Sequence, residues 1–368
     1  MIMKIIYISK IQLFISYSKI HQEYKQNEYY FKLCNNNKLR INKFYKKLNE
    51  PKISIISPMF NREKYILRFI KSIQYQNFNS IEIIVIDDFS NDNSVKIIEN
   101  LQKLDKRIIL LKNIKNKGTF ITRNIGIIYA KAKYLIAPDP DDILSKNILS
   151  ICYKYVERFN YDIIRFNMYI GKEKLNLHQI VNKLTKKMVN QPELSTYTFY
   201  GTNELQLIDL SLCNKLIKKK IYMLTLNLLN NYYYNMYITY SEDTLINYIL
   251  YRKAKSYIFL NNIGYYYIKN SLSITNNLFR KSNLKINFFF ILLKFFFEYS
   301  RNTKYEKDIS NFLFSKLNVD FNLLISLSNI NNNRNKFIEC FYGIINMYLN
   351  SKYISKENKN LFFFIIFF

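Results

Sequence analysis

Short β-branched runs alternate with helical segments over the first part of the chain, and this alternation constrains the fold more than any other feature. Nearly every residue of four such runs is apolar, as in strands that are buried on both faces: residues 53–57, 81–86, 108–111 and 134–137. Between them lie helical patterns such as Ile66, Phe69, Ile70 and Ile73, which share one helix face. The sequence therefore predicts an α/β fold with a mostly parallel central sheet and flanking helices.

The rest of the chain divides into three parts. We predict an α/β domain over residues 50–275, a partly helical N-terminal extension over residues 1–49, and a helical, Phe-rich C-terminal region over residues 276–368. Within the α/β domain the polar segment 171–205 reads as irregular. Two helices are expected at 217–229 and 245–250, and one or two strands at 257–269.

Composition limits the function classes. The chain of 368 residues carries 55 Lys and Arg against 27 Asp and Glu, a net charge of +28 that by itself favours nucleic acid or anionic membrane as a partner. The excess is spread along the whole chain, as on an ordinary solvated surface, so no nucleic-acid partner is expected; a basic nucleic-acid-binding protein remains an alternative. Four Cys without a C-x-x-C pair and two His argue against a disulfide framework or a zinc site.

No segment reads as a signal peptide or a membrane span. Lys4 and Lys10 interrupt the apolar N-terminus, and no run reaches the ~20 apolar residues that a spanning helix needs. The expected location is therefore the cytoplasm, or the cytoplasmic face of a membrane. Phe-rich stretches at 288–293 and 361–368 with lysines nearby are compatible with peripheral membrane contact, although core packing is their favoured use.

Three acidic features stand out in this basic chain. Asp87-Asp88 and Asp139-Pro140-Asp141-Asp142 follow predicted strands, and Glu242-Asp243 begins a predicted helix. Taken singly, these motifs are explained as a helix cap, a turn and a complement to the helix dipole. Taken together at the carboxyl ends of parallel strands, where such folds bind ligands, they favour a site for a hard divalent cation and a phosphorylated ligand.

The ordered set of motifs resembles the family 2-type inverting glycosyltransferases with the GT-A fold, a Rossmann-like fold that uses nucleotide-activated sugars. The resemblance covers residues 51–275. It rests on the following segments: Pro58-Met59-Phe60-Asn61, Glu82 to Asp92, Asn116-Lys117-Gly118, Arg123-Asn124-Ile125-Gly126, Asp139 to Asp142, Cys213 to Leu216, Glu242-Asp243 and Tyr265 to Lys269. Phe60 stands where the family usually has Tyr, and Ile268 stands in the position of an Arg, with Lys269 beside it.

The resemblance implies a role for each matching residue. Asp243 would be the catalytic base and Glu242 would support the acceptor site, while Asp139 and Asp141 would hold Mg²⁺ or Mn²⁺. The residues implied to bind the nucleotide donor are Pro58, Phe60, Asp87, Asp88, Asn124, Asp139 and Lys269.

The implied reaction is the transfer of a hexosyl or N-acetylhexosaminyl group, with inversion, from a nucleotide-diphospho-sugar to an acceptor hydroxyl. A UDP-sugar is the favoured donor, and the acceptor would be a glycan, lipid or protein. A metal ion would neutralise the leaving diphosphate, and a carboxylate would take the acceptor proton. A catalytically inactive GT-A scaffold is the main alternative.

Overall fold

The computed structural model describes residues 50–171, 186–190, 211–233, 238, 242–269 and 295 of the protein. The predicted N-terminal extension lies outside these residues, as does the predicted C-terminal region apart from Phe295.

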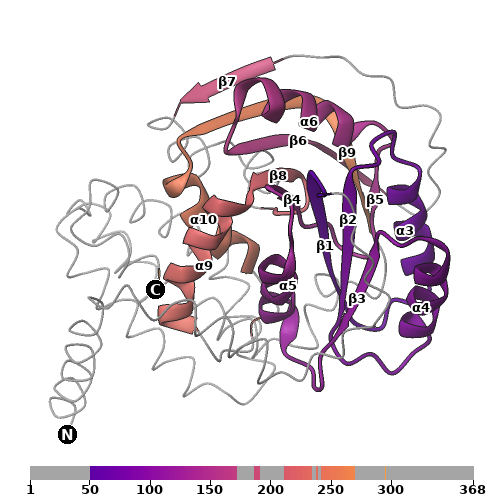
Figure 1. The fold of residues 1–368 in the computed structure, drawn as a ribbon. Helices are drawn as coiled ribbons and strands as arrows, with labels where there is room; N and C mark the ends of the chain where they lie inside the picture. The colour runs from indigo at the N-terminus through magenta and orange to yellow at the C-terminus, as the bar shows by residue number, and fades with distance from the viewer. Residues whose placement is uncertain are drawn as a thin grey trace, which may run out of the picture.

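The first four strands form the predicted parallel arrangement, in the order β3-β2-β1-β4 (Figure 1). Their bounds are β1 Ile53–Met59, β2 Ile81–Asp87, β3 Ile108–Lys112 and β4 Tyr134–Ile136. All residues of β1, β2 and β4 are buried, as expected for strands covered on both faces. This half of the sheet confirms the sequence prediction.

Three helices cover this half of the sheet: α3 Ile66–Gln74, α4 Ser94–Leu104 and α5 Gly118–Tyr129. Helices α3 and α4 lie on one face and α5 on the other (Figure 1). Strand residues alternate between the two resulting cores, since Ile55 packs with α3 and Ile56 packs with α5. At Gly126 of α5 a Cβ atom would lie 2.6 Å from Ile56 Cγ2, so glycine lets this helix approach the sheet closely.

Beyond β4 the sheet becomes mixed, with parallel and antiparallel neighbours. The strands are β5 Ile143–Leu144, β6 Ile163–Gly171, β7 Lys186–Asn190, β8 Lys215–Lys218 and β9 Ser256–Ile268. The order continues as β4-β8-β6-β9-β5, and β7 also pairs with β9. Strand β8 runs antiparallel to both neighbours, and β9 is parallel to β6 but antiparallel to β5 and β7.

Three further helices are α6 Ile148–Phe159, α9 Lys219–Tyr233 and α10 Glu242–Lys253. The helix expected from residue 217 begins two residues later, because Ile217 pairs with Leu135 and Ile163 in the sheet. Strand β7 lies in a segment that was expected to be irregular, and residues 257–269 form one strand rather than two. Within the described residues, no helix combines the length and the apolar character needed to cross a membrane.

Candidate active site

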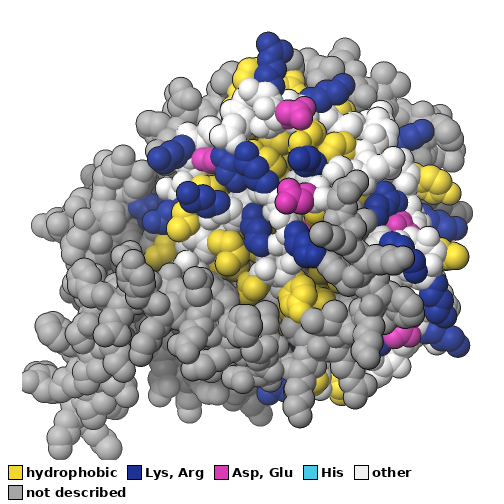
Figure 2. Space-filling view, viewed as in Figure 1, with side chains coloured by type: hydrophobic (Ala, Val, Ile, Leu, Met, Phe, Trp, Pro, Cys, Tyr) yellow, Lys and Arg dark blue, Asp and Glu magenta, His cyan; other side chains and the backbone are white. Residues whose placement is uncertain are grey.

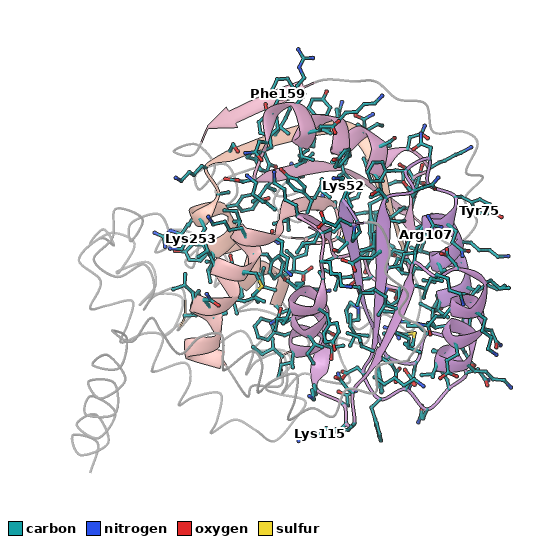
Figure 3. All side chains as sticks on the ribbon, in the orientation of Figure 1. Lys52, Tyr75, Arg107, Lys115, Phe159 and Lys253 are labelled. Atoms are coloured by element: carbon teal, nitrogen blue, oxygen red, sulfur yellow. The ribbon has the colours of Figure 1, made fainter. Side chains whose placement is uncertain are left out.

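The carboxyl ends of the parallel strands place several predicted site residues at one edge of the sheet. Phe60 follows β1, Asp87 ends β2, and Asp139 is the third residue after β4. In Figure 3, Lys52, which precedes β1, and Lys115, which follows β3, lie at opposite edges of the sheet. Parallel strands bring their carboxyl ends together, so sequence-distant residues meet at the Lys115 edge.

Arg123 of α5 is the centre of the acidic cluster. Its Nη1 donates to Glu242 Oε1 at 3.0 Å and to Asp243 Oδ1 at 3.2 Å, and its Nη2 donates to Asp139 Oδ1 at 3.0 Å. Only 2% of the Arg123 side chain is exposed. One buried guanidinium therefore joins carboxylates from the segment after β4 and from the start of α10. Its fixed fork of donors suits this geometry, which a lysine could not reproduce.

Crowding of negative charge changes the proton affinities of the cluster. Burial and the adjacent Asp243 raise the pKa of Glu242 to about 7, against the opposing effect of Arg123. Burial likewise raises the pKa of Asp139 to about 6, although 35% of its side chain is exposed and water screens part of the effect. Burial would lower the pKa of Arg123, but the surrounding carboxylates raise it well above its ordinary value.

A tyrosine of β9 holds the Asp139 to Asp142 turn in place. Tyr265 Oη donates to Asp142 Oδ2 at 2.6 Å and accepts from the Asp139 backbone N–H at 3.0 Å. The buried Asp142 carboxylate also accepts from the Ile268 N–H at 2.8 Å. The turn is therefore anchored at Asp142, while Asp139 and Asp141 remain partly exposed. Asp141 Oδ2 lies 3.6 Å from Arg62 Nε.

Asp87, the last residue of β2, and Asp88, which follows it, have different hydrogen-bond partners. Asp88 accepts hydrogen bonds from Asn113 Nδ2 and from the backbone N–H groups of Lys117 and Gly118, so it ties β2 to the start of α5. Among the described residues, the Asp87 carboxylate accepts from one residue, Ser90. The Ser90 N–H lies 3.2 Å from Oδ1 and 3.3 Å from Oδ2, and the Ser90 side chain also hydrogen-bonds to the carboxylate. Burial raises the pKa of Asp87. Asp87 therefore has more capacity left for a ligand than Asp88.

The remaining predicted residues differ in exposure. The Phe60 side chain is 42% exposed and precedes Asn61, whose φ of 52° turns the chain away from β1. Asn124 is buried on α5 beside Arg123, and its Oδ1 has no hydrogen-bond partner among the described residues. Pro58 is buried within β1, and Lys269 is exposed after β9, where its N–H donates to Gly171 O at 2.8 Å.

The sequence prediction assigned no role to Arg123, Arg62 or Tyr265, although Arg123 and Tyr265 lie in the quoted motifs. The available signal was the Arg123 side chain itself, a charge in a helix whose neighbouring positions are mostly apolar. Such a position predicts a buried ion pair, because an isolated buried charge is costly. Its three partners lie 16, 119 and 120 residues away, which the local pattern does not reveal.

Carboxylates are the candidate ligands for a hard cation at this edge of the sheet. The described part of the chain includes no group of three or more His, Cys, Asp or Glu side chains placed to hold a metal ion. Asp139 and Asp141 form a pair of partly exposed carboxylates. Asp139 Oδ2 accepts no hydrogen bond from the residues that the structure describes. Mg²⁺ is commonly held by one or two carboxylates together with substrate phosphates and water, so the pair fits a shared site.

Part of the chain matches the model of a known family. Residues 54–223 match the family described as Glycosyl transferase family 2. Glycosyltransferase GlyG of Streptococcus pneumoniae serotype 4 is 33% identical over 117 residues, which are 32% of this chain and 39% of GlyG. The GalNAc(5)-diNAcBac-PP-undecaprenol beta-1,3-glucosyltransferase of Campylobacter jejuni is 42% identical over 101 residues, 27% of this chain and 33% of that enzyme. The match thus spans a third to two-fifths of these relatives.

The fold is also similar to a solved structure. TarS 1-349 of S. aureus, crystallised in complex with UDP-GlcNAc, superposes with a TM-score of 0.60 at 18% identity and covers 81% of each chain. At this identity the likeness concerns the fold, and it agrees with the GT-A architecture predicted from the motifs.

Proposed function

Because residues 54–223 belong to the family 2 glycosyltransferases, we propose that this protein transfers a sugar from a nucleotide-diphospho-sugar to an acceptor hydroxyl, with inversion at the anomeric carbon. A UDP-sugar is the proposed donor, in keeping with the UDP-GlcNAc bound by TarS. The proposed acceptor is a hydroxyl of a glycan, lipid or protein, and the Campylobacter relative is named for a lipid-linked glycan acceptor. Peripheral membrane contact stays a proposal.

The observation that supports this proposal most strongly is the convergence of Asp139, Glu242 and Asp243 on Arg123. A structural ion pair needs one carboxylate for one guanidinium, whereas here three surround one cation. Such an excess of negative charge is costly without a function, because like charges disfavour one another's ionised form. Two of the three, Asp139 and Asp243, are also partly exposed, so a ligand can reach them.

Asp139 and Asp141 are the proposed holders of Mg²⁺ or Mn²⁺. Their pairing on one anchored turn, the uncommitted Asp139 Oδ2 and the excess of negative charge fit a divalent cation that is shared with a diphosphate. When bound, the cation would neutralise charge on the departing diphosphate. Phe60 offers an exposed ring for stacking against the donor base, and Asp87 offers a carboxylate for a hydrogen bond to it.

Asp243 is the proposed general base. Its side chain is 25% exposed, against 9% for Glu242, so it is the member of the acidic pair that an acceptor can reach. Arg123 holds Oδ1, and the Leu212 N–H donates to Oδ2 at 3.3 Å, which together fix the orientation of the carboxylate. Each carboxylate oxygen has a second lone pair for the acceptor hydroxyl. As the acceptor oxygen bonds to the anomeric carbon, its proton passes to Asp243 and the bond to the diphosphate breaks.

Glu242 and Arg123 are positioning residues in this proposal. Arg123 is buried and its guanidinium hydrogen-bonds to the carboxylates, so it holds them in place rather than contacting a ligand. Glu242, buried against the same guanidinium, completes the pairing of Nη1. Their function is to keep Asp243 and Asp139 at a fixed separation, because small errors of placement reduce the rate strongly.

A donor screen tests the proposal. The full chain is incubated with UDP- and GDP-sugars and mixed hydroxyl acceptors, with Mg²⁺, with Mn²⁺ or with EDTA, and release of free nucleotide is followed. We expect metal-dependent release of UDP that Asp243→Asn abolishes and that Glu157→Gln, an exposed change on α6, leaves intact. If neither release nor UDP binding by calorimetry occurs with any donor, the inactive-scaffold alternative replaces the proposal.

A further inference from the structure

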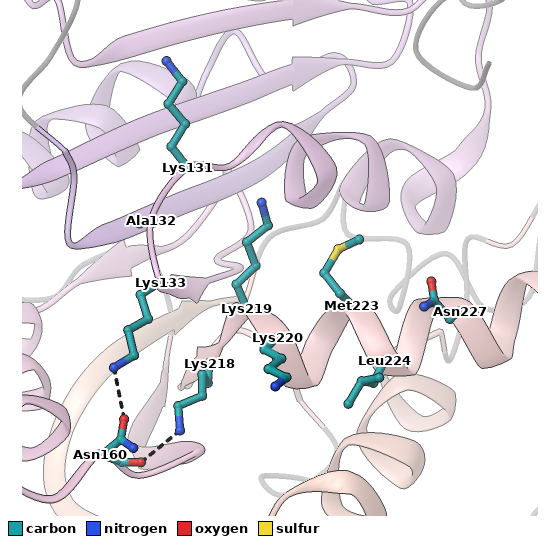
Figure 4. A pocket seen from close by; sticks show the side chains of 10 residues that line it. All are labelled: Lys131, Ala132, Lys133, Asn160, Lys218, Lys219, Lys220, Met223, Leu224 and Asn227. Atoms are coloured by element: carbon teal, nitrogen blue, oxygen red, sulfur yellow. Dashed lines mark hydrogen bonds between the residues drawn. The ribbon is translucent and has the colours of Figure 1, made fainter. Parts of the chain in front are cut away.

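A basic pocket lies at the other edge of the sheet from the acidic cluster. It is a hollow of about 750 Å³ lined by Lys131, Lys133, Lys218, Lys219 and Lys220 (Figure 4). Lys133 precedes β4 whereas Asp139 follows it, and β8 pairs Lys218 with the first residue of β4. The pocket and the acidic cluster are therefore separated by the length of a strand.

The lining of this pocket includes five lysines and no Asp or Glu. Lys218 Nζ pairs with Asp162 Oδ1 at 2.7 Å. Lys219 Nζ donates to the Ala130 carbonyl oxygen, and the charge of Glu82 favours the protonated form of Lys219. Burial lowers the pKa of Lys219, because its ammonium group is partly removed from water. On the face that Figure 2 shows, Lys and Arg side chains lie among acidic, apolar and uncharged ones. The pocket differs in that no acidic residue lines it.

The start of α9 adds to the positive potential. Lys219 and Lys220 occupy the first turn of this helix, and that turn contains no acidic residue. The N-terminus of a helix carries a partial positive charge, so these are the positions where lysine is disfavoured and an anion is stabilised. An anion in the pocket would relieve both the repulsion among the lysines and their conflict with the helix dipole.

Asn160 holds two of the lysines toward one another. Its Oδ1 accepts from Lys133 Nζ at 3.1 Å and its backbone O accepts from Lys218 Nζ at 3.1 Å (Figure 4). Asn160 ends α6 with a φ of 54°, and its Oδ1 also accepts from Tyr134 Oη at 3.1 Å. The two ammonium groups are thus partly oriented before any ligand arrives, which lowers the entropic cost of binding one.

We propose that this pocket binds a phosphate-bearing ligand, with the phosphate among the lysines and an apolar portion against Met223 and Leu224. Lysine ammonium groups act as point charges that suit a phosphate, and none of the lining residues is an arginine that would form a fork on a planar carboxylate. Leu224 is 42% exposed and Met223 is half-buried, so α9 contributes an apolar wall. The volume falls in the range of small-molecule sites.

Methyl NMR on the full chain tests the proposal without any assay of transfer. The Met223 methyl signal, assigned with Met223→Leu, is followed while pyrophosphate is added in EDTA. We expect a saturable shift whose affinity falls at least about tenfold in the double variant Lys133→Gln/Lys220→Gln. The matched control, Lys96→Gln/Lys103→Gln on α4, removes the same charge from exposed positions. It is expected to change the affinity for pyrophosphate less than about twofold.

A second arm separates the two sources of phosphate. Sedimentation with phosphatidylcholine vesicles, with and without phosphatidylglycerol, measures binding to lipid headgroups. Vesicle binding that is weakened by the pocket variant and not by the control assigns the ligand to a lipid, and a response to pyrophosphate alone assigns it to a soluble phosphate. The proposal is overturned if neither probe responds, or if the pocket and control variants lose affinity equally. Because no donor sugar is used, failure here leaves the proposed transferase activity untouched.

Discussion

Arg123 and Asp243 are 120 residues apart in the sequence and form an ion pair of 3.2 Å at the edge of the sheet. Arg123 belongs to a helix that covers the parallel strands, and Asp243 lies in the first turn of α10. The pair therefore couples the two halves of the domain at the place where the proposed transfer occurs.

Replacing Asp243 by Asn removes the proposed base and keeps the shape of the side chain. We expect the rate of sugar transfer to fall by about 10² to 10⁴, the usual contribution of general base catalysis. Affinity for UDP, measured by calorimetry, should stay within about threefold, because the variant leaves the Phe60 and Asp87 region unchanged. A variant that transfers sugar at the wild-type rate would show that another group accepts the proton.

Replacing Arg123 by Met should destabilise the domain, because three carboxylates lose their shared counter-ion. We expect a loss of about 2–4 kcal/mol of unfolding free energy, measured in urea; the partial exposure of Asp139 keeps the value toward the lower end. Arg123→Lys retains one charge but not the fork, so it should recover part of the stability while transfer stays low. Equal stability of wild type and Arg123→Met would contradict the role assigned to this residue.

Removing the hydroxyl of Tyr265 should loosen the turn that presents Asp139 and Asp141. Tyr265→Phe leaves Asp142 without one of its donors and the Asp139 N–H without its acceptor, at a cost of about 1–3 kcal/mol in unfolding free energy. The Mg²⁺ concentration for half-maximal activity should rise as well, since the turn holds the proposed metal carboxylates. Tyr267→Phe, a matched change two residues along β9, is the control and should alter neither quantity.

Asp105 after α4 provides a test of stability against pH. Burial acts to raise its pKa, but hydrogen bonds from Arg107, Gln74 and the Arg107 backbone outweigh this effect and lower it. A carboxyl whose pKa is lowered by folding stabilises the protein fully above its unfolded value, 3.8, and loses that contribution as the pH falls through the folded value.

The corresponding variant is Asp105→Asn. Urea unfolding should show a deficit of about 1–2 kcal/mol relative to wild type at pH 7 and pH 5. The deficit should shrink as the pH is taken below about 4, where the wild-type carboxyl becomes protonated. A deficit that grows in acid would mean that the Asp105 contacts do not favour its ionised form.

Local patterns in the sequence were sufficient for the first half of the sheet. Continuous apolar runs predict β1 and β2 as strands that are buried on both faces, and the apolar stripe on α3 predicts a helix that covers one of these faces. Both patterns are local and do not depend on the rest of the chain. The acidic motifs were recognisable for a related reason, since each follows a strand or opens a helix, and parallel strands present their carboxyl ends together.

Other features depended on contacts between distant residues. The antiparallel direction of β8 follows from its pairing with both β4 and β6, which no pattern within Lys215–Lys218 reveals. In the same way, Asp87 and Asp88 are equivalent in sequence, yet only Asp88 accepts hydrogen bonds from Asn113 and from the first residue of α5.

By itself, the sequence determined the α/β class, the parallel half of the sheet and which acidic motifs to consider, because hydrophobic period and turn chemistry act over a few residues. Only the tertiary structure decided that Arg123 joins Asp139, Glu242 and Asp243, and that five lysines surround one pocket. Charge interactions depend on distances in space rather than along the chain. Where such groups meet is therefore set by the packing of the helices on the sheet.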